Sequence, residues 1–407
     1  MGRFVISGGK RLSGDVYIDG SKNAALPILF ATILTSGVSV IENLPDISDV
    51  HTALDILRGF GARIWECDGK VCIDTTNLVY TEPSEELTSK IRASSYLLGA
   101  CLGRFGKAKI QNFGGCNFDT RPIDMHLLAA ASHGATVTSR EISAGLLLGS
   151  DIHFDKISVG ATVNAILMAV SAVGKSRIFC YAKEPHIISL VNFLISAGAK
   201  IKITSEYIEI VGAQLSGGRT KIIPDMIEAG TFLLLSLLCS SELRIHNPDA
   251  DSLSYFLNVL RRSGVTFSEE ENLIVPHGAL EGYVEITTAP HPFFPTDLQP
   301  QTAPLLAAFS GGRINEGVWQ GRFGYLKELR KFGVRYECSC ASAEIYKSKI
   351  HSACAEAPDL RGGAALLMCA LFSEGESIIE NSEIIKRGYG DIVNKLSHIG
   401  ADIIEIP

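Results

Sequence analysis

Residues 227–240 read IEAGTFLLLSLLCS, and residues 243–267, which follow almost at once, read LRIHNPDADSLSYFLNVLRRSGVTF. The first stretch is apolar on nearly every face of a helix, which predicts a helix inside a core. The second has a β-rich start, a polar loop and a helical pattern with one charged face, and Gly264 stands where a helix C-cap is expected. One buried helix, short strands and one surface helix therefore form the unit from which we expect the fold to be built.

This unit recurs six times along the chain. The β-rich stretch, polar loop, amphipathic helix and closing glycine return at a spacing of about 67 residues. These segments are 39–64, 108–137, 176–201, 243–267, 313–336 and 377–403, with closing glycines Gly61, Gly134, Gly198, Gly264, Gly333 and Gly400. The apolar segments are 21–34, 89–103, 158–174, 227–240, 296–310 and 359–373. Three units make about 200 residues, so we expect an α/β protein of two domains, each with three strand–helix units around buried helices.

Composition and charge narrow the class of protein. The 407 residues are 46% hydrophobic and 20% charged, as in ordinary globular domains, and the net charge of -7 gives no reason to expect nucleic acid or an anionic membrane as partner. The apolar runs fall short of the roughly 20 residues that span a bilayer, and the first residues lack a signal-peptide core, so we expect a cytoplasmic protein. The ten cysteines are scattered without a CxxC pair, which favours neither a disulfide framework nor a zinc site. We expect most of them to be small buried residues, and we expect no metal.

Polar residues gather where the apolar segments begin. They are Lys22 and Asn23, Lys90 and Arg92, Ser158 to Gly160, Glu228, Thr296 and Asp297, and Asp359 and Arg361. The first turn of a helix has unpaired N–H groups and a positive dipole end, which attract anions, and Lys or Arg nearby strengthens the attraction. Each residue alone is also explained as a helix cap or a solvated side chain. If such ends from both domains face one cleft, that cleft binds a highly anionic substrate.

One cysteine differs from the rest. In QNFGGCNFDTRP, residues 111–122, Cys116 follows two glycines and precedes Arg121 by five residues. Glycines allow the backbone to bend, and a nearby cation favours thiolate over thiol. This pattern predicts a reactive cysteine on a loop that closes over a substrate.

Several longer motifs carry a resemblance to a known family. In order, they are GSKNAALPILFATIL (20–34), GGC (114–116) with RPIDMH (121–126), DKISVGATVNAILM (155–168), TAPHPFFPTDLQPQ (288–301), PDLRGGAAL (358–366) and KRGYGDIVNKLSHIGADI (386–403). Along essentially the full length they resemble the UDP-N-acetylglucosamine 1-carboxyvinyltransferases, and several motifs in the correct order are far more specific than one short pattern. The resemblance implies an inside-out α/β barrel of the enolpyruvyl transferase type, with one domain at 22–223 and the other at 1–21 and 224–407. It also implies an active site in the cleft between the two domains.

The resemblance further implies the reaction. These cytoplasmic enzymes of peptidoglycan synthesis transfer enolpyruvyl from phosphoenolpyruvate to the 3'-hydroxyl of UDP-N-acetylglucosamine and release phosphate, as the first committed step. Their substrates carry phosphate, carboxylate and diphosphate groups, which fixed cations must neutralise. The expected partners are these two substrates, and we expect no cofactor and a monomer.

The matching positions give the expected site residues. For phosphoenolpyruvate they are Lys22, Asn23, Arg121, Arg322, Arg361 and Arg387, with Lys22, Arg121 and Arg387 near its phosphate and Arg322 and Arg361 near its carboxylate. For UDP-N-acetylglucosamine they are Asn23, Arg92, Arg121, Pro122, Ile123, Asp124, Met125, His126, Lys156, Ser158, Val159, Gly160, Asp297 and Val318. Outside the family context, His126 is more typical of a core or helix-face histidine than of a ligand.

The resemblance assigns the catalytic roles to Cys116, Asp297, Lys22 and Arg387. Asp297 matches the aspartate beside the 3'-hydroxyl and is expected to act as the base, with a pKa raised by a closed site, although an aspartate here is also typical of a helix N-cap. Cys116 is expected to act as the general acid that protonates the methylene carbon of phosphoenolpyruvate, and it is also a candidate for a covalent adduct with a carbon of phosphoenolpyruvate.

Some positions depart from the family pattern. Asp119 stands where a glycine is usual, Gln320 and Gly321 alter the segment before Arg322, Met226 replaces an arginine, and Ile385 and Lys386 precede Arg387. These departures leave two alternatives open. Beside transfer to UDP-N-acetylglucosamine, which stays the main expectation, the chain could be a divergent paralogue that transfers enolpyruvyl to another uridine nucleotide in specialised biosynthesis, or a non-catalytic protein that binds UDP-N-acetylglucosamine.

Overall fold

The computed structural model describes residues 2–114 and 122–407, so Cys116, Asp119 and Arg121 lie outside the described residues. The chain divides into two compact units, one of residues 2–19 and 224–407 (unit 1) and one of residues 20–114 and 122–223 (unit 2). The chain passes between the units at residues 19–20 and again at residues 223–224. Backbone hydrogen bonds join the two crossings on both sides. Ser21 N–H donates to Ile223 O at 2.7 Å in unit 2, and Asp225 N–H donates to Asp19 O at 2.8 Å in unit 1.

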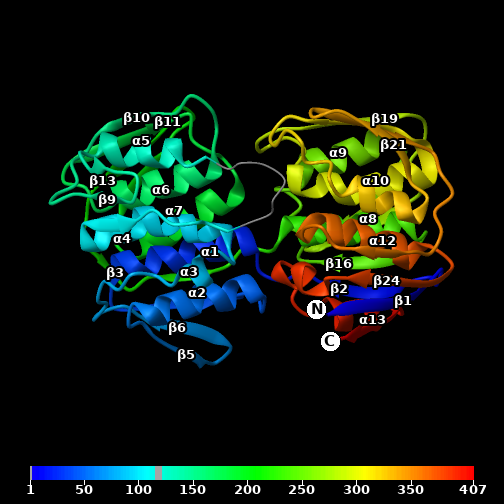
Figure 1. The fold of residues 1–407 in the computed structure, drawn as a ribbon, viewed down its shortest axis with the longest axis horizontal. Helices are drawn as coiled ribbons and strands as arrows, with labels where there is room; N and C mark the ends of the chain where they lie inside the picture. The colour runs from blue at the N-terminus through cyan, green and yellow to red at the C-terminus, as the bar shows by residue number, and fades with distance from the viewer. Residues whose placement is uncertain (1, 115–121) are drawn as a thin grey trace. The chain divides into compact units, whose positions relative to one another are not determined.

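The apolar segments form the buried helices of both units (Figure 1). In unit 2 they are α1 (Lys22–Ala31), α4 (Leu97–Phe105) and α6 (Val159–Ala169), and in unit 1 α8 (Met226–Leu238), α10 (Gln299–Leu305) and α12 (Leu360–Phe372). Segment 89–103 is not one helix, because a 3₁₀ segment, η2 (Arg92–Tyr96), precedes α4. Likewise α10 ends in a π-helical segment (Leu306–Ser310). The expectation of helices hydrophobic on every face is confirmed.

The amphipathic segments form the outer helices. They are α2 (Ser48–Gly59), α5 (Asp124–Ser132), α7 (Pro185–Ser196), α9 (Ser254–Arg262), α11 (Leu326–Leu329) and α13 (Ile392–His398). All six closing glycines have φ between 84° and 107°, a left-handed conformation that favours glycine over residues with a side chain. The predicted C-cap glycines are confirmed.

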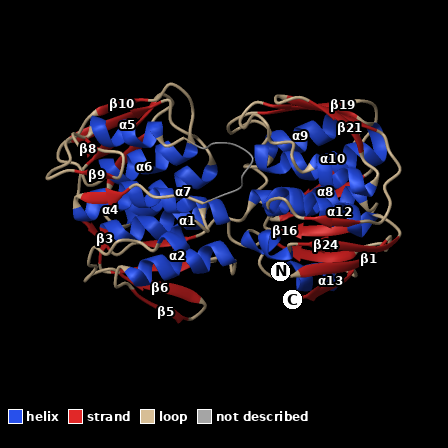
Figure 2. Ribbon diagram, in the orientation of Figure 1, coloured by secondary structure: helices blue, strands red, loops and turns tan. Residues whose placement is uncertain are grey.

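Short strands lie toward the outside of each unit (Figure 2). The sheets of unit 1 are ordered β23-β24-β1-β25, β17-β18-β16-β2 and β19-β20-β22-β21. Their strands are β1 (Arg3–Gly8), β2 (Ser13–Tyr17), β16 (Glu242–His246), β17 (Thr266–Glu270), β18 (Leu273–His277), β19 (Val284–Thr288), β20 (Gly312–Glu316), β21 (Arg335–Cys338), β22 (Ser342–Tyr346), β23 (Cys354–Glu356), β24 (Gly375–Glu380) and β25 (Asp402–Ile406).

The sheets of unit 2 are β15-β4-β6-β5, β10-β11-β13-β12 and β7-β9-β8, with a further pair β14-β3. Their strands are β3 (Thr35–Ser36), β4 (Val38–Glu42), β5 (Arg63–Cys67), β6 (Lys70–Asp74), β7 (Lys107–Lys109), β8 (Thr136–Val137), β9 (Glu141–Ser143), β10 (Asp151–His153), β11 (Lys175–Phe179), β12 (Lys200–Ile203), β13 (Tyr207–Val211), β14 (Leu215–Ser216) and β15 (Arg219–Lys221). Every four-stranded sheet of the described residues combines one parallel pair with two antiparallel pairs. The sequence repeat is therefore also a repeat of topology.

The prediction that most cysteines are buried is wrong. Among the nine described cysteines, all of which are free thiols, the exposed ones are Cys67, Cys180, Cys338, Cys340 and Cys354. They lie at strand ends or in the loops beside them, where side chains face water, rather than in the buried helices. Cys101 and Cys369 fit the prediction, because they lie in α4 and α12 and burial raises the pKa of each thiol.

Across the described residues, no helix combines the length and the apolar character needed to cross a bilayer. The described residues also hold no group of three or more His, Cys, Asp and Glu side chains arranged for a metal ion.

Candidate active site

Asp297 and two arginines form a buried ion cluster in unit 1. Asp297 lies in the 3₁₀ turn η3 (Thr296–Leu298) that leads into α10, Arg361 is in the first turn of α12, and Arg322 follows β20. Arg322 Nη2 is 2.9 Å from Asp297 Oδ1, and Arg361 Nη2 is 3.1 Å from Asp297 Oδ2. The arginine side chains are only 6% and 4% exposed, against 29% for the aspartate. Three segments far apart in the sequence thus place two cations around one accessible carboxylate.

The cluster sets the ionisation of Asp297. Burial by itself raises the pKa of this carboxyl, but the charges of Arg361 and Arg322 outweigh burial and hold the pKa well below its usual range. The expectation of a raised pKa does not hold in this arrangement, because the carboxylate already has two charge-assisted partners. The side chain also bonds to arginine rather than to a backbone amide, so it is no helix cap.

Helix capping positions Arg361 within this cluster. The carboxylate of Asp359 accepts hydrogen bonds from the backbone N–H groups of Arg361 at 2.9 Å and Gly362 at 3.0 Å, and so starts α12. For Asp359 the capping alternative is therefore the correct one. The guanidinium of Arg361 also donates from Nη1 to the Tyr389 hydroxyl at 3.4 Å.

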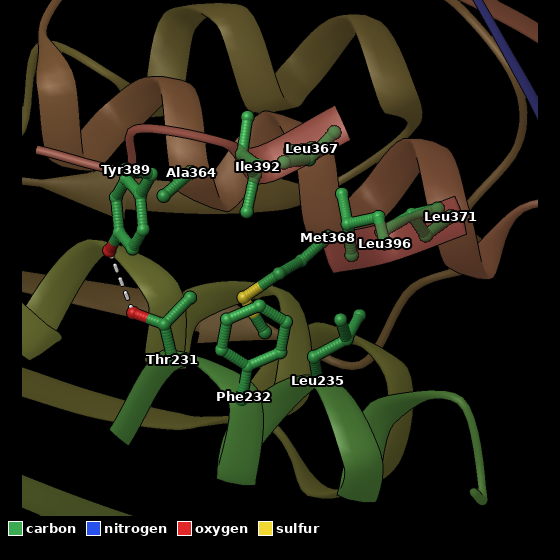
Figure 3. Close-up of a pocket in the computed structure, with 10 residues that line it drawn as sticks. All are labelled: Thr231, Phe232, Leu235, Ala364, Leu367, Met368, Leu371, Tyr389, Ile392 and Leu396. Atoms are coloured by element: carbon green, nitrogen blue, oxygen red, sulfur yellow. Dashed lines mark hydrogen bonds between the residues drawn. The ribbon is translucent and has the colours of Figure 1, made fainter. Parts of the chain in front are cut away.

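A small apolar pocket lies between α8 and α12 (Figure 3), and Tyr389, which accepts from Arg361, is part of its lining. Its lining is almost entirely aliphatic and aromatic carbon, and its two hydroxyl groups, on Thr231 and Tyr389, bond to each other at 2.8 Å. Gln301 Nε2 lies 3.3 Å from both hydroxyl oxygens. Because these hydroxyls already bond to each other, to Gln301 and to Arg361, and the rest of the lining is apolar, we interpret the pocket as a packing gap beside Tyr389.

In unit 2, a cluster of neutral polar groups surrounds Asn164. Asn164 in α6 is fully buried, and its Oδ1 accepts from Gly99 N–H at 2.6 Å while its Nδ2 donates to Ser95 O at 3.1 Å. Since Gly99 N–H can only donate, the amide nitrogen faces Nδ1 of His126 at 2.7 Å, and that ring nitrogen accepts. One amide therefore joins η2, α4, α5 and α6.

His126 is a buried neutral side chain. It is 4% exposed, and burial, followed by the charge of Arg92, lowers its pKa to about 4. A methyl group at Gly160 would lie 3.0 Å from Cε1 of His126, so the absence of a side chain there lets α5 and α6 meet at their N-terminal ends. The structure thus brings residues 122–126 beside residues 158–160.

The other residues expected around the nucleotide lie at these two helix starts. Pro122, Asp124 and Lys156 are exposed, whereas Ile123, Met125, Ser158, Val159 and Gly160 are half-buried. The Ser158 hydroxyl accepts from Ala161 N–H at 3.3 Å and caps α6, as the capping alternative predicted.

Lys22 and Asn23 open α1 and are both half-buried. Lys22 Nζ is 2.7 Å from Asp49 Oδ2 on α2, and the two side chains are 11% and 4% exposed. Like the two arginines, this expected cation is held by a carboxylate of its own unit.

Two further expected site residues, Arg387 and Val318, are located by their neighbouring elements. Arg387 ends a 3₁₀ segment (Ser382–Arg387) two residues before Tyr389, and Val318 follows β20; both are half-buried. Among the departures, Met226 packs at the start of α8, Gln320 is exposed, and Lys386 pairs with Glu405 at 2.8 Å. None of these three touches the Asp297 carboxylate in the contacts of the described residues.

Two buried polar residues escaped the sequence reasoning. Glu316 ends β20 and Asn164 stands alone inside an apolar helix, and both are at most 4% exposed. A lone polar residue within an apolar run is a usable signal, because a buried polar group needs hydrogen-bond partners.

Comparisons with known proteins show the family of the chain. The family model described as EPSP synthase (3-phosphoshikimate 1-carboxyvinyltransferase) matches residues 6–396. A protein of Halothermothrix orenii called UDP-N-acetylglucosamine 1-carboxyvinyltransferase is 40% identical and matches over 100% of both chains. A protein of Listeria monocytogenes called UDP-N-acetylglucosamine 1-carboxyvinyltransferase 2 is 41% identical over 98% of this chain and 97% of its own length.

Solved structures give the same fold. The enolpyruvyl transferase NikO from Streptomyces tendae superposes with a TM-score of 0.90 at 27% identity, over 100% of this chain and 99% of that one. An EPSP synthase from Acinetobacter baumannii superposes at 0.73 over 100% of both chains, with 16% identity. The expected fold class, an α/β enolpyruvyl transferase fold, is confirmed. The chain therefore belongs to the enolpyruvyl transferase family that includes EPSP synthase, among the UDP-N-acetylglucosamine 1-carboxyvinyltransferases.

Proposed function

We propose that this protein transfers the enolpyruvyl group of phosphoenolpyruvate to the 3'-hydroxyl of UDP-N-acetylglucosamine and releases phosphate, as the first committed step of peptidoglycan precursor synthesis. The observation that carries the proposal is the Asp297 cluster, a carboxylate flanked by two buried arginines, in a chain of this family. A base beside two cations suits the attack of a hydroxyl on an anionic substrate. We include a cytoplasmic location and a monomeric state in the proposal, which rest on the family resemblance.

The reaction is an addition followed by an elimination. Asp297 accepts the proton of the attacking hydroxyl, a C–O bond forms to the central carbon of phosphoenolpyruvate, and Cys116 supplies a proton to the methylene carbon. The bond from the central carbon to the phosphate oxygen then breaks, phosphate leaves, and a proton is lost from the methyl group to restore the double bond. Cys116 lies outside the described residues, so its role rests on its motif alone.

In the Asp297 cluster, an exchange of ion pairs precedes the transfer of the proton. Arg322 and Arg361, assigned to the substrate carboxylate, both bind Asp297 in this structure. An incoming carboxylate competes for the same guanidinium groups. As those contacts weaken, the pKa of Asp297 rises toward its ordinary value and the carboxylate becomes a stronger base. Binding of the donor therefore activates the base.

Phosphate release tests the proposal. The wild-type protein should release phosphate from phosphoenolpyruvate only when UDP-N-acetylglucosamine is present, and Cys116→Ala should abolish that release. Cys180→Ala is the matched control, because Cys180 is an exposed free thiol in unit 2. Loss of activity in both variants, or retention in both, would remove Cys116 from the mechanism.

The likeness to NikO motivates a second candidate, since that structure is named only as an enolpyruvyl transferase and superposes at 0.90. In this candidate the acceptor is another uridine nucleotide. A panel of uridine nucleotides with and without the amino sugar separates the two, because phosphate release follows the true acceptor. If nucleotides stabilise the protein and none supports phosphate release, the chain is a non-catalytic binder.

A further inference from the structure

Glu316 is a buried carboxylate that binds neutral groups on every side. It ends β20 and is 4% exposed. Oε1 accepts from the Thr288 hydroxyl at 2.7 Å and from the backbone N–H groups of Val318 and Trp319 at 2.8 and 2.9 Å. Oε2 accepts from the Thr296 hydroxyl at 2.9 Å. Burial of a carboxylate is costly, so an arrangement that supplies four donors to one is a built feature.

Thr296 connects this carboxylate to the ion cluster. A hydroxyl has one proton, and here it goes to Glu316, which leaves the oxygen lone pairs to accept. Arg322 Nη1 donates to that oxygen at 2.8 Å, while Nη2 of the same guanidinium lies 2.9 Å from Asp297 Oδ1. Both contacts hold the guanidinium, and the contact with Thr296 depends on Glu316, which orients the hydroxyl.

The other oxygen of Glu316 fixes the turn that follows β20. The N–H groups of Val318 and Trp319 both point at Oε1, and Thr288 Oγ1 also accepts from Gly317 N–H at 3.0 Å. Val318 is a residue assigned to the sugar nucleotide, and Arg322 is assigned to the donor. A single side chain therefore governs one contact residue for each substrate.

We propose that Glu316 and Thr296 are positioning residues of the transfer reaction, which hold Arg322 for the donor carboxylate and the Val318 turn for the acceptor. The inference rests on the proposed function. In this proposal neither residue touches a substrate. Each acts through the group that it orients, and the two differ in reach, because Thr296 serves only Arg322 whereas Glu316 serves Arg322 and the Val318 turn.

Isosteric variants test this division of roles. Thr296→Val keeps the shape and removes the hydroxyl, Thr296→Ser keeps the hydroxyl, and Glu316→Gln replaces two acceptors by one acceptor and one donor. Loss of a hydrogen bond to a charged group is expected to raise KM for phosphoenolpyruvate about ten- to hundredfold in Thr296→Val, with a much smaller change in KM for UDP-N-acetylglucosamine. Thr296→Ser should restore most of the loss, and Glu316→Gln should raise both KM values.

Two exposed neighbours on β19 serve as controls for the substitutions themselves. In the part of the chain that the structure describes, the hydrogen bonds of Thr287 Oγ1 and Glu285 Oε1 go to Asn315 on the sheet surface, so Thr287→Val and Glu285→Gln should leave both KM values at the wild-type level. A melting temperature measured for each variant detects general damage, which would lower stability without separating the two KM values. A rise in both KM values for Thr296→Val equal to that of Glu316→Gln would contradict the separate reach of the two residues.

The failure of this inference is distinguishable from failure of the proposed function. If the wild-type protein is active and Thr296→Val and Glu316→Gln keep wild-type KM values, the inference alone is overturned. If the wild-type protein is inactive but each substrate raises its melting temperature, the same variants should weaken those shifts in the same pattern, and unchanged shifts overturn the inference. If the wild-type protein shows neither turnover nor a shift, both proposals are overturned.

Discussion

The Asp297 cluster of unit 1 and the Asn164 cluster of unit 2 are built with different chemistry. In unit 1, Asp297, Arg322 and Arg361 carry full charges and pair with one another, whereas in unit 2 the amide of Asn164 and a neutral His126 share hydrogen bonds. Charged partners can be exchanged for a charged substrate, because the incoming anion replaces the one that leaves. A neutral buried network has no such substitute and fixes the backbone around it. Under the proposed function, the Asp297 cluster exchanges partners when the donor binds, whereas the Asn164 cluster holds the helix starts assigned to the acceptor.

Neutralisation of the Asp297 carboxylate tests most directly whether the charged cluster of unit 1 takes part in the reaction. Asp297→Asn removes the proposed base, and kcat should fall by about 10²- to 10⁴-fold. Because the internal competitor for Arg322 and Arg361 is weakened, KM for phosphoenolpyruvate should not rise. Steady-state phosphate release measures both constants. Asp55→Asn, which removes a carboxylate from an exposed pair with Arg58, should leave both constants unchanged; an unaltered kcat in Asp297→Asn would refute the exchange.

His126 in unit 2 and Asp297 in unit 1 should lose their contributions to stability over different ranges of acid pH. The folded protein keeps His126 neutral down to about pH 4, whereas an unfolded histidine binds a proton near pH 6.5. Stability should therefore fall as the pH drops from about 6.5 to 4, by up to about 3 kcal/mol for this residue. The stability from Asp297, whose pKa is depressed, is present above about pH 4 and is lost only as the pH falls further toward that lower pKa.

Urea unfolding at several pH values between 7 and 4 measures this slope. His126→Gln should flatten it, and His51→Gln, a change at a side chain 63% exposed, should leave it as in the wild type. Buried His133, whose pKa is also lowered by burial, supplies part of the slope that remains. Equal slopes in wild type and His126→Gln would contradict a neutral buried His126.

Removal of the Asn164 amide should lower the stability of the protein rather than its kcat. Asn164→Ala leaves Gly99 N–H and Ser95 O without their partner inside the core, and the free energy of unfolding should fall by about 2–3 kcal/mol. Equilibrium unfolding in urea measures the change. As a control, Asn394→Ala on the exposed face of α13 should change the free energy of unfolding by less than about 0.5 kcal/mol. Equal changes in the two variants would contradict a stabilising role of the Asn164 hydrogen bonds.

A substitution at Gly160 tests the close contact between α5 and α6. In Gly160→Ala the new methyl group would press on the His126 ring at 3.0 Å, which should destabilise the protein by about 1 kcal/mol and raise KM for the nucleotide a few-fold. At Gly59 no atom lies within 4 Å of an added Cβ, so Gly59→Ala should instead stabilise by about 0.5 kcal/mol. Opposite signs in thermal unfolding would support the close approach, and a neutral Gly160→Ala would remove it.

The sequence predicted the repeated parts of the fold because each is decided locally. An apolar run such as 227–240 has to be buried whatever surrounds it, and Gly264 ends its helix through its own backbone freedom. The same locality explains the error about cysteines, since Cys338 and Cys354 are placed by strand ends that short apolar context does not reveal.

The chemistry of the site depends on contacts that no local pattern contains. Arg361 reaches Asp297 across 64 positions and lowers its pKa, whereas sequence reasoning expected a raised value. Thr296 and Glu316 meet across 20 positions, and Asn164 meets Gly99 across 65. Motif resemblance supplied the names of the reacting residues, and the structure supplied the residues that orient them. The roles of Cys116 and Arg121 stay predictions.

The connectivity of the strands also sets an order of assembly during synthesis. β1 pairs with β24 and β25, and β2 pairs with β16, so the first two strands wait for partners made hundreds of residues later. The strands of unit 2 find all of their partners within residues 20–223. On the ribosome, unit 2 can close while β1 and β2 are still unpaired, and contacts this distant in sequence form slowly. The nascent chain therefore passes through a long interval in which the two N-terminal strands have unpaired edges and are available to chaperones.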